Sequence, residues 1–298
     1  MSQTTTERTE RPLAQRLTGT HTQEGAGFPV RRPFPGHGLQ MVDPFLLLDE
    51  MGPKDWAPGQ AQGAPDHPHR GFETVTYMLD GRFEHRDSFG FSGQLNPGDV
   101  QWMTAGAGVV HSEMPEETLR RDGGRVHGIQ LWVNLPATDK WVQPRYQDTP
   151  AERIPEVTGD WGRARVIAGE ALGASAVIET RIPILYLHLT IEPGHEVTVE
   201  VPAAYQGFVY PLAGSGTVSV GDNALADGEL GLLGEGEPVR LGAPAGTDQP
   251  ADLLLVAGRP LGEPVARYGP FVMTNREEID QAFQDFRDGR MGEIPRPG

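Results

Sequence analysis

Short strand-like runs, separated by turn residues, recur along the whole chain and most constrain its fold. They include Asp43–Glu50, Phe72–Leu79, Arg82–Ser88, Val100–Met103, Val109–Met114, Val126–Asn134, Ala164–Gly169, Ile184–Ile191, Glu196–Val201, Gly207–Leu212, Thr217–Val220 and Asp252–Ala257. The 39 glycines and 27 prolines fall between such runs without a fixed period, as tight turns require. The spacing predicts an all-β chain built from antiparallel barrels or sandwiches.

The 298 residues are enough for two domains of ordinary size. We predict a mobile N-terminal arm at 1–27, a barrel at 28–142, a linker at 143–160 and a second barrel at 161–298. The linker is polar and rich in proline, and a weak internal repeat relates Glu73–Gly81 to Gln206–Gly214. One short C-terminal helix is predicted after Asn275, which is a good N-cap residue.

Charge and composition exclude several classes of function. The formal net charge is −16 and the pI is near 4.9, which opposes binding to nucleic-acid backbones and to anionic membranes. The chain has no cysteine, so disulfides, thiolate catalysis and cysteine-ligated metals are excluded. We find no apolar run of about 20 residues and no apolar signal-peptide core, and we expect a cytoplasmic protein.

Two short segments concentrate the chemistry. In an extended chain alternate side chains share a face, so His67 and His69 can reach one point, as can His111 and Glu113. Two neighbouring strands can therefore aim three imidazoles and one carboxylate at one transition-metal ion and leave positions open for a substrate or O₂. Alone, a His-x-His pair is more often a surface or hydrogen-bonded pair than a ligand pair.

The two histidine-containing pairs and the turn between them, taken together, indicate a fold more specifically than either pair alone. The turn Asn96-Pro97-Gly98-Asp99 lies between them, and His111 follows Gly98 by thirteen residues. This is the two-motif layout of a cupin barrel.

From about residue 30 to residue 292 the chain resembles the pirin family, a bicupin branch of the cupin superfamily. The segments that carry the resemblance are Val42–Glu50, Asp66–Val75, Asn96–Gly106, Val109–Pro115, Gly128–Leu135 and Gly269–Met273. The family's His-x-His and His-x-Glu ligands fall on His67, His69, His111 and Glu113 without a departure. The pair Thr274-Asn275 stands in the reverse of the usual family order, which concerns the helix cap and not the site.

The resemblance implies a bicupin fold with one Fe(II) per chain, held in the N-terminal barrel. Mn, Co, Ni, Cu or Zn also suit this donor set. It further implies a dioxygenase that opens quercetin or a similar flavonol or enediol with O₂. The alternative is a redox-sensing regulator that binds a transcription factor or a metabolic enzyme. A sugar isomerase or epimerase, as in other cupins, is a third and weaker interpretation.

Further residues are candidates for the site. Glu73 has the strand parity of His67 and His69, so it is a candidate catalytic base or hydrogen-bond acceptor; a purely structural carboxylate is the equal alternative. His127 and Gln130 are candidate pocket residues, although packed barrel positions would explain both. Glu113 is a second candidate for accepting a substrate proton.

The second half lacks the ligand pattern. Alignment of the two halves places Glu200, Pro202, Leu241 and Ala243 at the four ligand positions. Three of these side chains cannot bind a metal ion, and one carboxylate makes a poor site for a transition metal. We therefore predict that the C-terminal barrel binds no metal.

Overall fold

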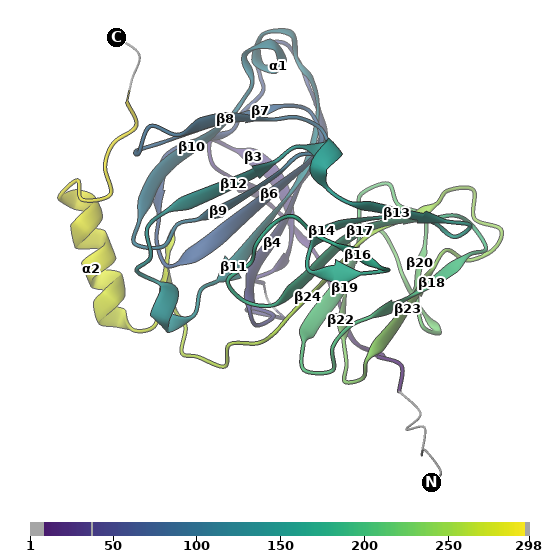
Figure 1. Cartoon of the computed structure of the whole chain (residues 1–298). Helices are drawn as coiled ribbons and strands as arrows, with labels where there is room; N and C mark the ends of the chain where they lie inside the picture. The colour runs from purple at the N-terminus through teal and green to yellow at the C-terminus, as the bar shows by residue number, and fades with distance from the viewer. Residues whose placement is uncertain (1–8, 37, 296–298) are drawn as a thin grey trace. The chain divides into compact units, whose positions relative to one another are not determined.

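A computed structural model describes residues 9–36 and 38–295 (Figure 1). The chain forms two compact units. One consists of residues 20–153 and 261–298, and we call it the metal-motif unit because it contains both histidine motifs. The other consists of residues 1–19 and 154–260. We describe each unit separately.

The described residues of the metal-motif unit form two main antiparallel sheets. The larger has the strand order β12 (Arg145–Thr149), β9 (Val100–Thr104), β6 (Phe72–Asp80), β11 (Gly124–Asn134), β4 (Phe45–Trp56), β3 (Phe28–Phe34) and β2 (Thr20–Glu24). The smaller has the order β5 (Ala64–His69), β10 (Val109–Pro115), β7 (Phe83–Asp87) and β8 (Ser92–Leu95). The two sheets form a barrel with a side-chain-filled interior, and the central strands β6 and β9 are buried on both faces.

The second unit repeats this architecture in the part that the structure describes. Its larger sheet has the order β1 (Leu13–Thr18), β22 (Glu229–Leu233), β19 (Gln206–Pro211), β24 (Ala251–Gly258), β17 (Ile184–Ile191), β14 (Gly162–Ala168) and β13 (Glu156–Gly159). Its smaller sheet has the order β18 (Glu196–Glu200), β23 (Pro238–Gly242), β20 (Val218–Val220) and β21 (Asn223–Leu225). The predicted all-β bicupin fold is confirmed.

Short elements complete the chain. They are the hairpins β15 (Glu170–Ala171) with β16 (Ala174–Ser175) and β25 (Ala266–Tyr268) with β26 (Phe271–Met273), the helices α1 (Glu117–Asp122) and α2 (Arg276–Arg287), and single 3-10 turns at Ala137–Asp139 and Ala151–Arg153. No helix among the described residues is long and apolar enough to cross a membrane.

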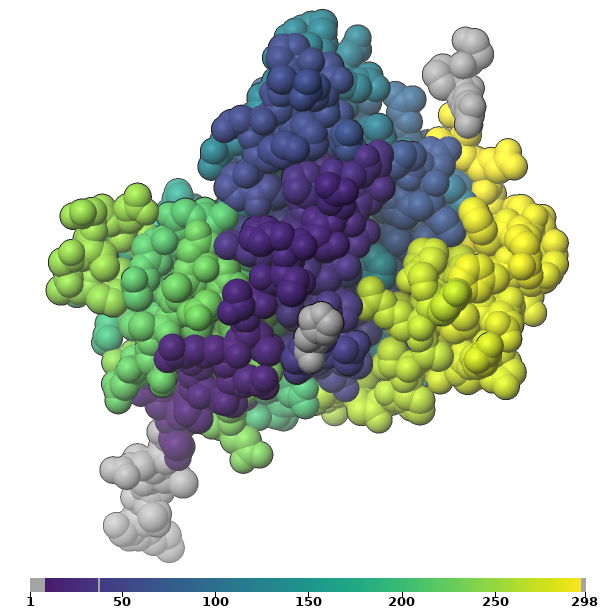
Figure 2. Space-filling model, turned by 180° about the vertical axis from the view of Figure 1, so that it is seen from behind, coloured from purple at the N-terminus to yellow at the C-terminus, as the bar shows by residue number. Residues whose placement is uncertain are grey.

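The predicted C-terminal helix is α2, and its first turn shows why it begins where it does. The Asn275 side chain accepts a hydrogen bond from the Glu278 amide at 2.9 Å, and Glu278 accepts one from the Thr274 amide at 2.9 Å. This reciprocal cap satisfies amides that have no partner within the helix. Ile279 and Ala282 form its buried face. In Figures 1 and 2 the yellow C-terminal residues lie beside the blue strands of the metal-motif unit, to which they belong.

The segment predicted as a mobile arm differs from that expectation. Residues 1–8 lie outside the described residues, but β1 and β2 occupy Leu13–Thr18 and Thr20–Glu24. The Arg11 guanidinium is buried and donates to the carbonyls of Gly236, Pro202 and Ala203. Strand β2 lies at a sheet edge with every side chain exposed, so its sequence is polar and lacks the alternation of a half-buried strand.

The segment predicted as a linker at 143–160 also contains regular structure. Strand β12 belongs to the metal-motif unit and β13 to the second unit, and the division falls between Arg153 and Ile154. Residues 261–298 belong to the metal-motif unit, whereas the sequence analysis predicted that 161–298 form one domain. Prolines that flank the two edge strands β12 and β13 account for the linker-like composition.

Candidate metal centre

Three histidines converge on the inner face of the metal-motif barrel. Strands β5 and β10 are antiparallel neighbours, and their register places His67 directly opposite His111. His69 lies two residues further along β5 and therefore on the same face. The ring centroids are 4.4 Å apart for His67 and His111, and 5.0 Å apart for His69 and His111. One nitrogen of each ring lies within 4.8 Å of the others.

Backbone carbonyls orient the two histidines of β5. The Nδ1 atom of His67 lies 2.7 Å from the Pro65 carbonyl oxygen, and Nδ1 of His69 lies 3.3 Å from that of Pro270. A carbonyl oxygen only accepts, so each Nδ1 carries the proton and each Nε2 presents a lone pair. These Nε2 atoms are 3.1 Å apart. Two nitrogens bound to one ion at about 2.1 Å and at right angles are separated by about 3 Å.

His111 is fully buried, and neither of its ring nitrogens has a hydrogen-bond partner among the described residues. An unsatisfied buried polar group costs about 1–3 kcal/mol, so native proteins rarely keep one without a function. Burial lowers the pKa of both His111 and His69 well below the usual value, and the neighbouring His67 lowers both further. Both rings are therefore neutral, which is the form that binds metals. The three residues fit a divalent transition-metal ion.

Glu113 lies beside this cluster but is not one of its members. Its Oε1 accepts a hydrogen bond from the Thr76 hydroxyl at 2.9 Å, and its Oε2 accepts one from the Gln130 amide at 3.1 Å. The pairing of β10 with β5 shifts register between His111 and Glu113, which pairs with Ala64. Simple alternation along two straight strands predicted four converging ligands; the structure brings three of them together and holds the fourth by hydrogen bonds.

A cavity of about 640 Å³ opens onto the centre. Its lining includes the two histidines of β5, His67 and His69. Six charged side chains also line it: Glu24, Arg32, Asp49, Asp66, Glu113 and Arg267. Gln130, Trp132 and Pro270 complete this part of the wall. An aromatic wall adjoins it: the Trp132 ring lies 4.3 Å from that of Phe72 and 5.2 Å from that of His69. This size is typical of a site for a small organic molecule.

Two further candidate residues lie away from this lining. Glu73 is buried and accepts a hydrogen bond from the Thr104 hydroxyl at 2.6 Å. Its neighbour Phe72 adjoins the aromatic wall, so strand alternation turns Glu73 to the other face of β6. Its predicted parity with the histidines does not hold because Gly71, at φ +86°, separates β5 from β6. His127 pairs with Glu50 at 2.8 Å and is also absent from the lining.

The C-terminal segment supplies contacts that no local motif indicated. The Pro270 carbonyl that orients His69 is about 200 residues downstream of it, and the Val272 amide donates to the Arg70 carbonyl at 3.0 Å. Gly71 permits this approach, since a Cβ there would collide with the Val272 carbonyl oxygen. The sequence marked this region only by the five-residue resemblance at Gly269–Met273, which suggested no role for it.

The interior of the second barrel has a different character. Its strands β18 and β23 pair Val199 with Val239 and Val197 with Leu241, and all four side chains are buried in the apolar core. The described residues show no second cluster of metal-binding side chains. Apolar side chains thus fill the space that the histidines occupy in the first barrel. That this barrel binds no metal remains a prediction.

Two seven-plus-four-stranded barrels, one with a buried histidine cluster, define a bicupin with a candidate metal centre. Residues 27–133 match the family Pirin, and residues 186–292 match the Pirin C-terminal cupin domain. The chain belongs to the pirin family.

Individual relatives cover nearly the whole chain. Pirin of Homo sapiens is 43% identical over 274 residues, which are 90% of each protein. A pirin-like protein of Solanum lycopersicum is 41% identical over 283 residues, covering 95% of this chain and 93% of the relative. The crystal structure of quercetin 2,3-dioxygenase from Acinetobacter baumannii superposes with a TM-score of 0.89 at 37% identity, covering 96% of this chain and all of that one.

Proposed function

We propose that this protein is an Fe(II)-dependent dioxygenase that opens a flavonol such as quercetin, or a similar enediol-bearing aromatic, with O₂. The observation that carries the proposal is the buried His111, which lacks a hydrogen-bond partner among the described residues and adjoins His67 and His69, two residues that line a ligand-sized cavity. The similarity to the Acinetobacter baumannii quercetin 2,3-dioxygenase supports this reaction.

The residues that would hold the ion are His67, His69 and His111, and Glu113 is the candidate fourth ligand. A bound Fe(II) would supply Lewis acidity and redox chemistry with O₂. The choice of iron rests on the family resemblance, because Mn, Co, Ni, Cu and Zn also suit imidazole and carboxylate donors. One ion per chain is proposed.

Glu113 is well placed to take the proton of a substrate hydroxyl. Its carboxylate lines the cavity, and the bonds from Thr76 and Gln130 fix its position. A base must lie within hydrogen-bond reach of the proton it removes, and a fixed carboxylate loses little freedom on meeting that requirement. Trp132 offers an apolar wall for the substrate ring. Glu73 and His127 lie outside this cavity, and we assign neither a role in the reaction.

The test is an anaerobic mixing experiment. Protein loaded with Fe(II) is mixed with quercetin and then exposed to O₂, and the flavonol absorption band is followed together with carbon monoxide release. We expect bleaching and one carbon monoxide per flavonol consumed. A His111→Phe protein, which retains the barrel core, provides the control. Absence of bleaching with every divalent metal in the series would refute the substrate assignment.

The regulatory alternative remains open to a direct test. The formal charge of −16 favours a basic protein partner. A pull-down that compares the Fe(II) and Fe(III) forms of the full chain would detect a redox sensor as a difference in the partners retained. Identical partners and affinities for the two forms would remove this alternative. A cytoplasmic location is part of both proposals.

A further inference from the structure

Arg267 lines the metal cavity from the C-terminal strand β25. Its guanidinium carbon lies 4.8 Å from the centroid of the Trp132 ring, in a cation–π contact. Its Nη1 donates one hydrogen bond, at 3.0 Å, to the carbonyl oxygen of Leu46. These two contacts hold the side chain in place at the wall of the cavity.

The remaining donors of this guanidinium have no partner among the described residues. A guanidinium carries five N–H donors, and only the bond to Leu46 is formed. Burial lowers its pKa, as does the nearby Arg32, whereas the charges of Asp49 and Glu24 raise it, but neither carboxylate forms an ion pair with it in the described part of the chain. A partly buried guanidinium whose donors are mostly unfilled is a favourable partner for the oxygens of an anion.

The other arginine of the cavity shows the contrast. Arg32 donates to both carboxylate oxygens of Asp49, from Nε at 2.7 Å and from Nη2 at 2.5 Å, and its Nη2 also lies 2.5 Å from Glu24. Arg32 thus neutralises two of the acidic groups that line the same cavity. Glu113 is held by Thr76 and Gln130. An incoming anion would therefore meet Arg267 as the cation whose donors are available.

The position of Arg267 also limits the size and shape of a ligand that could contact both this residue and the metal centre. Trp132 contacts both Arg267 and the metal centre, because its indole is 4.8 Å from the guanidinium and 5.2 Å from the His69 ring. The guanidinium and the His69 ring are thus within about 10 Å of each other and share one aromatic neighbour. One planar ring with substituents on opposite edges, lying along Trp132, can reach both.

We propose that Arg267 forms an anion-binding subsite, and that the substrate is an aromatic diol or flavonol with a carboxylate or other anionic oxygen at the end remote from the histidines. This inference rests on the proposed function and narrows its substrate class. Arg267 would act as a specificity-determining residue through charge-assisted hydrogen bonds, which are stronger than those between neutral groups.

A binding experiment without turnover tests the subsite. Zn(II)-loaded protein is titrated anaerobically by calorimetry with catechol and with 3,4-dihydroxybenzoate, which differ by one carboxylate. Wild-type protein should bind the carboxylate compound about tenfold more tightly or better, since hydrogen bonds to charged groups contribute about 1.5–3 kcal/mol. Arg267→Gln should reduce the ratio of the two affinities to near one, whereas Arg267→Lys should keep part of it.

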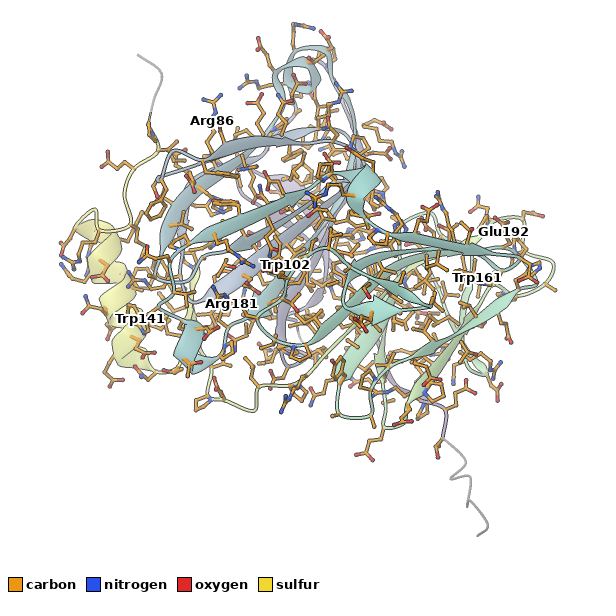
Figure 3. All side chains as sticks on the ribbon, viewed as in Figure 1. Arg86, Trp102, Trp141, Trp161, Arg181 and Glu192 are labelled. Atoms are coloured by element: carbon orange, nitrogen blue, oxygen red, sulfur yellow. The ribbon has the colours of Figure 1, made fainter. Side chains whose placement is uncertain are left out.

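Arg86→Gln is the matched control. Arg86 is a half-exposed arginine of β7, labelled in Figure 3, that pairs with Glu84 and does not line the metal cavity. It should leave the ratio unchanged. Equal affinities in wild-type protein, failure of 3,4-dihydroxybenzoate to bind it, or an undiminished ratio in folded Arg267→Gln would each overturn the proposal. Quercetin bleaching is scored separately, so either idea can fail while the other stands.

Discussion

Arg70 and Asp285 form a buried ion pair between the metal-binding segment and the C-terminal helix. Arg70 Nη1 lies 2.7 Å from Asp285 Oδ2, and the two side chains are only 4% and 10% exposed. The Arg70 Nε donates to the Ala107 carbonyl at 2.6 Å, and its guanidinium lies 5.0 Å from the ring of Trp141, labelled near α2 in Figure 3. Because Arg70 follows His69, this pair ties helix α2 to a candidate ligand.

Replacing Asp285 with Asn should weaken metal binding without removing a ligand. The change leaves the Arg70 charge buried without its carboxylate, and breaking a buried pair in this way costs about 3–5 kcal/mol. Loss of groups that orient ligands typically lowers metal affinity about 10–100-fold. Asp288→Asn is the control, because Asp288 pairs with Arg290 at 2.7 Å on the exposed side of the helix region. Competition titration with a chelator measures both; equal affinities would contradict this role for Asp285.

A His111→Phe variant should separate stability from function. Phenylalanine is similar in size and removes two buried nitrogens that lack partners in the described structure. We expect the metal-free variant to gain about 1–3 kcal/mol in its free energy of unfolding. It should also lose metal binding, so the metal-dependent rise in melting temperature disappears. Urea unfolding of chelator-treated proteins measures the first effect, and a destabilised variant that still binds the ion would refute both expectations.

The barrel strands and the three histidines could be predicted because each depends on local pattern. Alternation within β5 places His67 and His69 on one face, and His111 joins them once β5 and β10 are taken as neighbouring strands. The residues of the cavity wall that were not predicted lie far from the histidine motifs in the sequence. Arg267 and Pro270 reach the site through tertiary packing, and no periodicity near either residue indicates it.

The parity argument did not hold across the turn between β5 and β6. Glu73 was counted through Gly71, whose positive φ changes the direction of the chain, so its predicted face was wrong. Glu113 does face the same cavity as the histidines, but its hydrogen bonds to Thr76 and Gln130 come from strands outside the motif and could not be foreseen. The N-terminal edge strands likewise lacked an apolar face by which to recognise them.

Glu113→Gln should retain the metal and slow turnover strongly. An amide keeps an oxygen that can accept from Thr76 but does not take up a proton near neutral pH. General base catalysis is typically worth about 10²–10⁴-fold, so we expect a loss of that order in the rate of quercetin bleaching. Metal content should fall less than in His69→Ala, which removes an imidazole and should abolish binding. Near wild-type turnover by a metal-replete Glu113→Gln protein would exclude Glu113 as the base.

Metal-free protein should lose stability as the pH falls below about 6.5, the ordinary histidine pKa. Burial holds the pKa of His69 and His111 well below that value in the folded state. The unfolded chain then binds protons that the folded chain does not, so acidification favours unfolding by about 1.4 kcal/mol per pH unit for each histidine. Above this range the two groups contribute no pH dependence.

Urea unfolding at pH 7.5, 6.5 and 5.5 measures this effect. The His111→Phe protein is the comparison, and its stability should fall less steeply, by the share of one histidine. Parallel pH profiles for the two proteins would show that His111 is not held neutral by the fold.

The most direct test of the three-histidine centre is the metal content of the full chain after anaerobic reconstitution with Fe(II) and removal of excess ion. Elemental analysis should give close to one iron per wild-type chain, because His67, His69 and His111 form one centre and apolar side chains fill the second barrel. His111→Phe protein should give close to none. A reproducible two irons per wild-type chain, or full occupancy in the variant, would contradict the account.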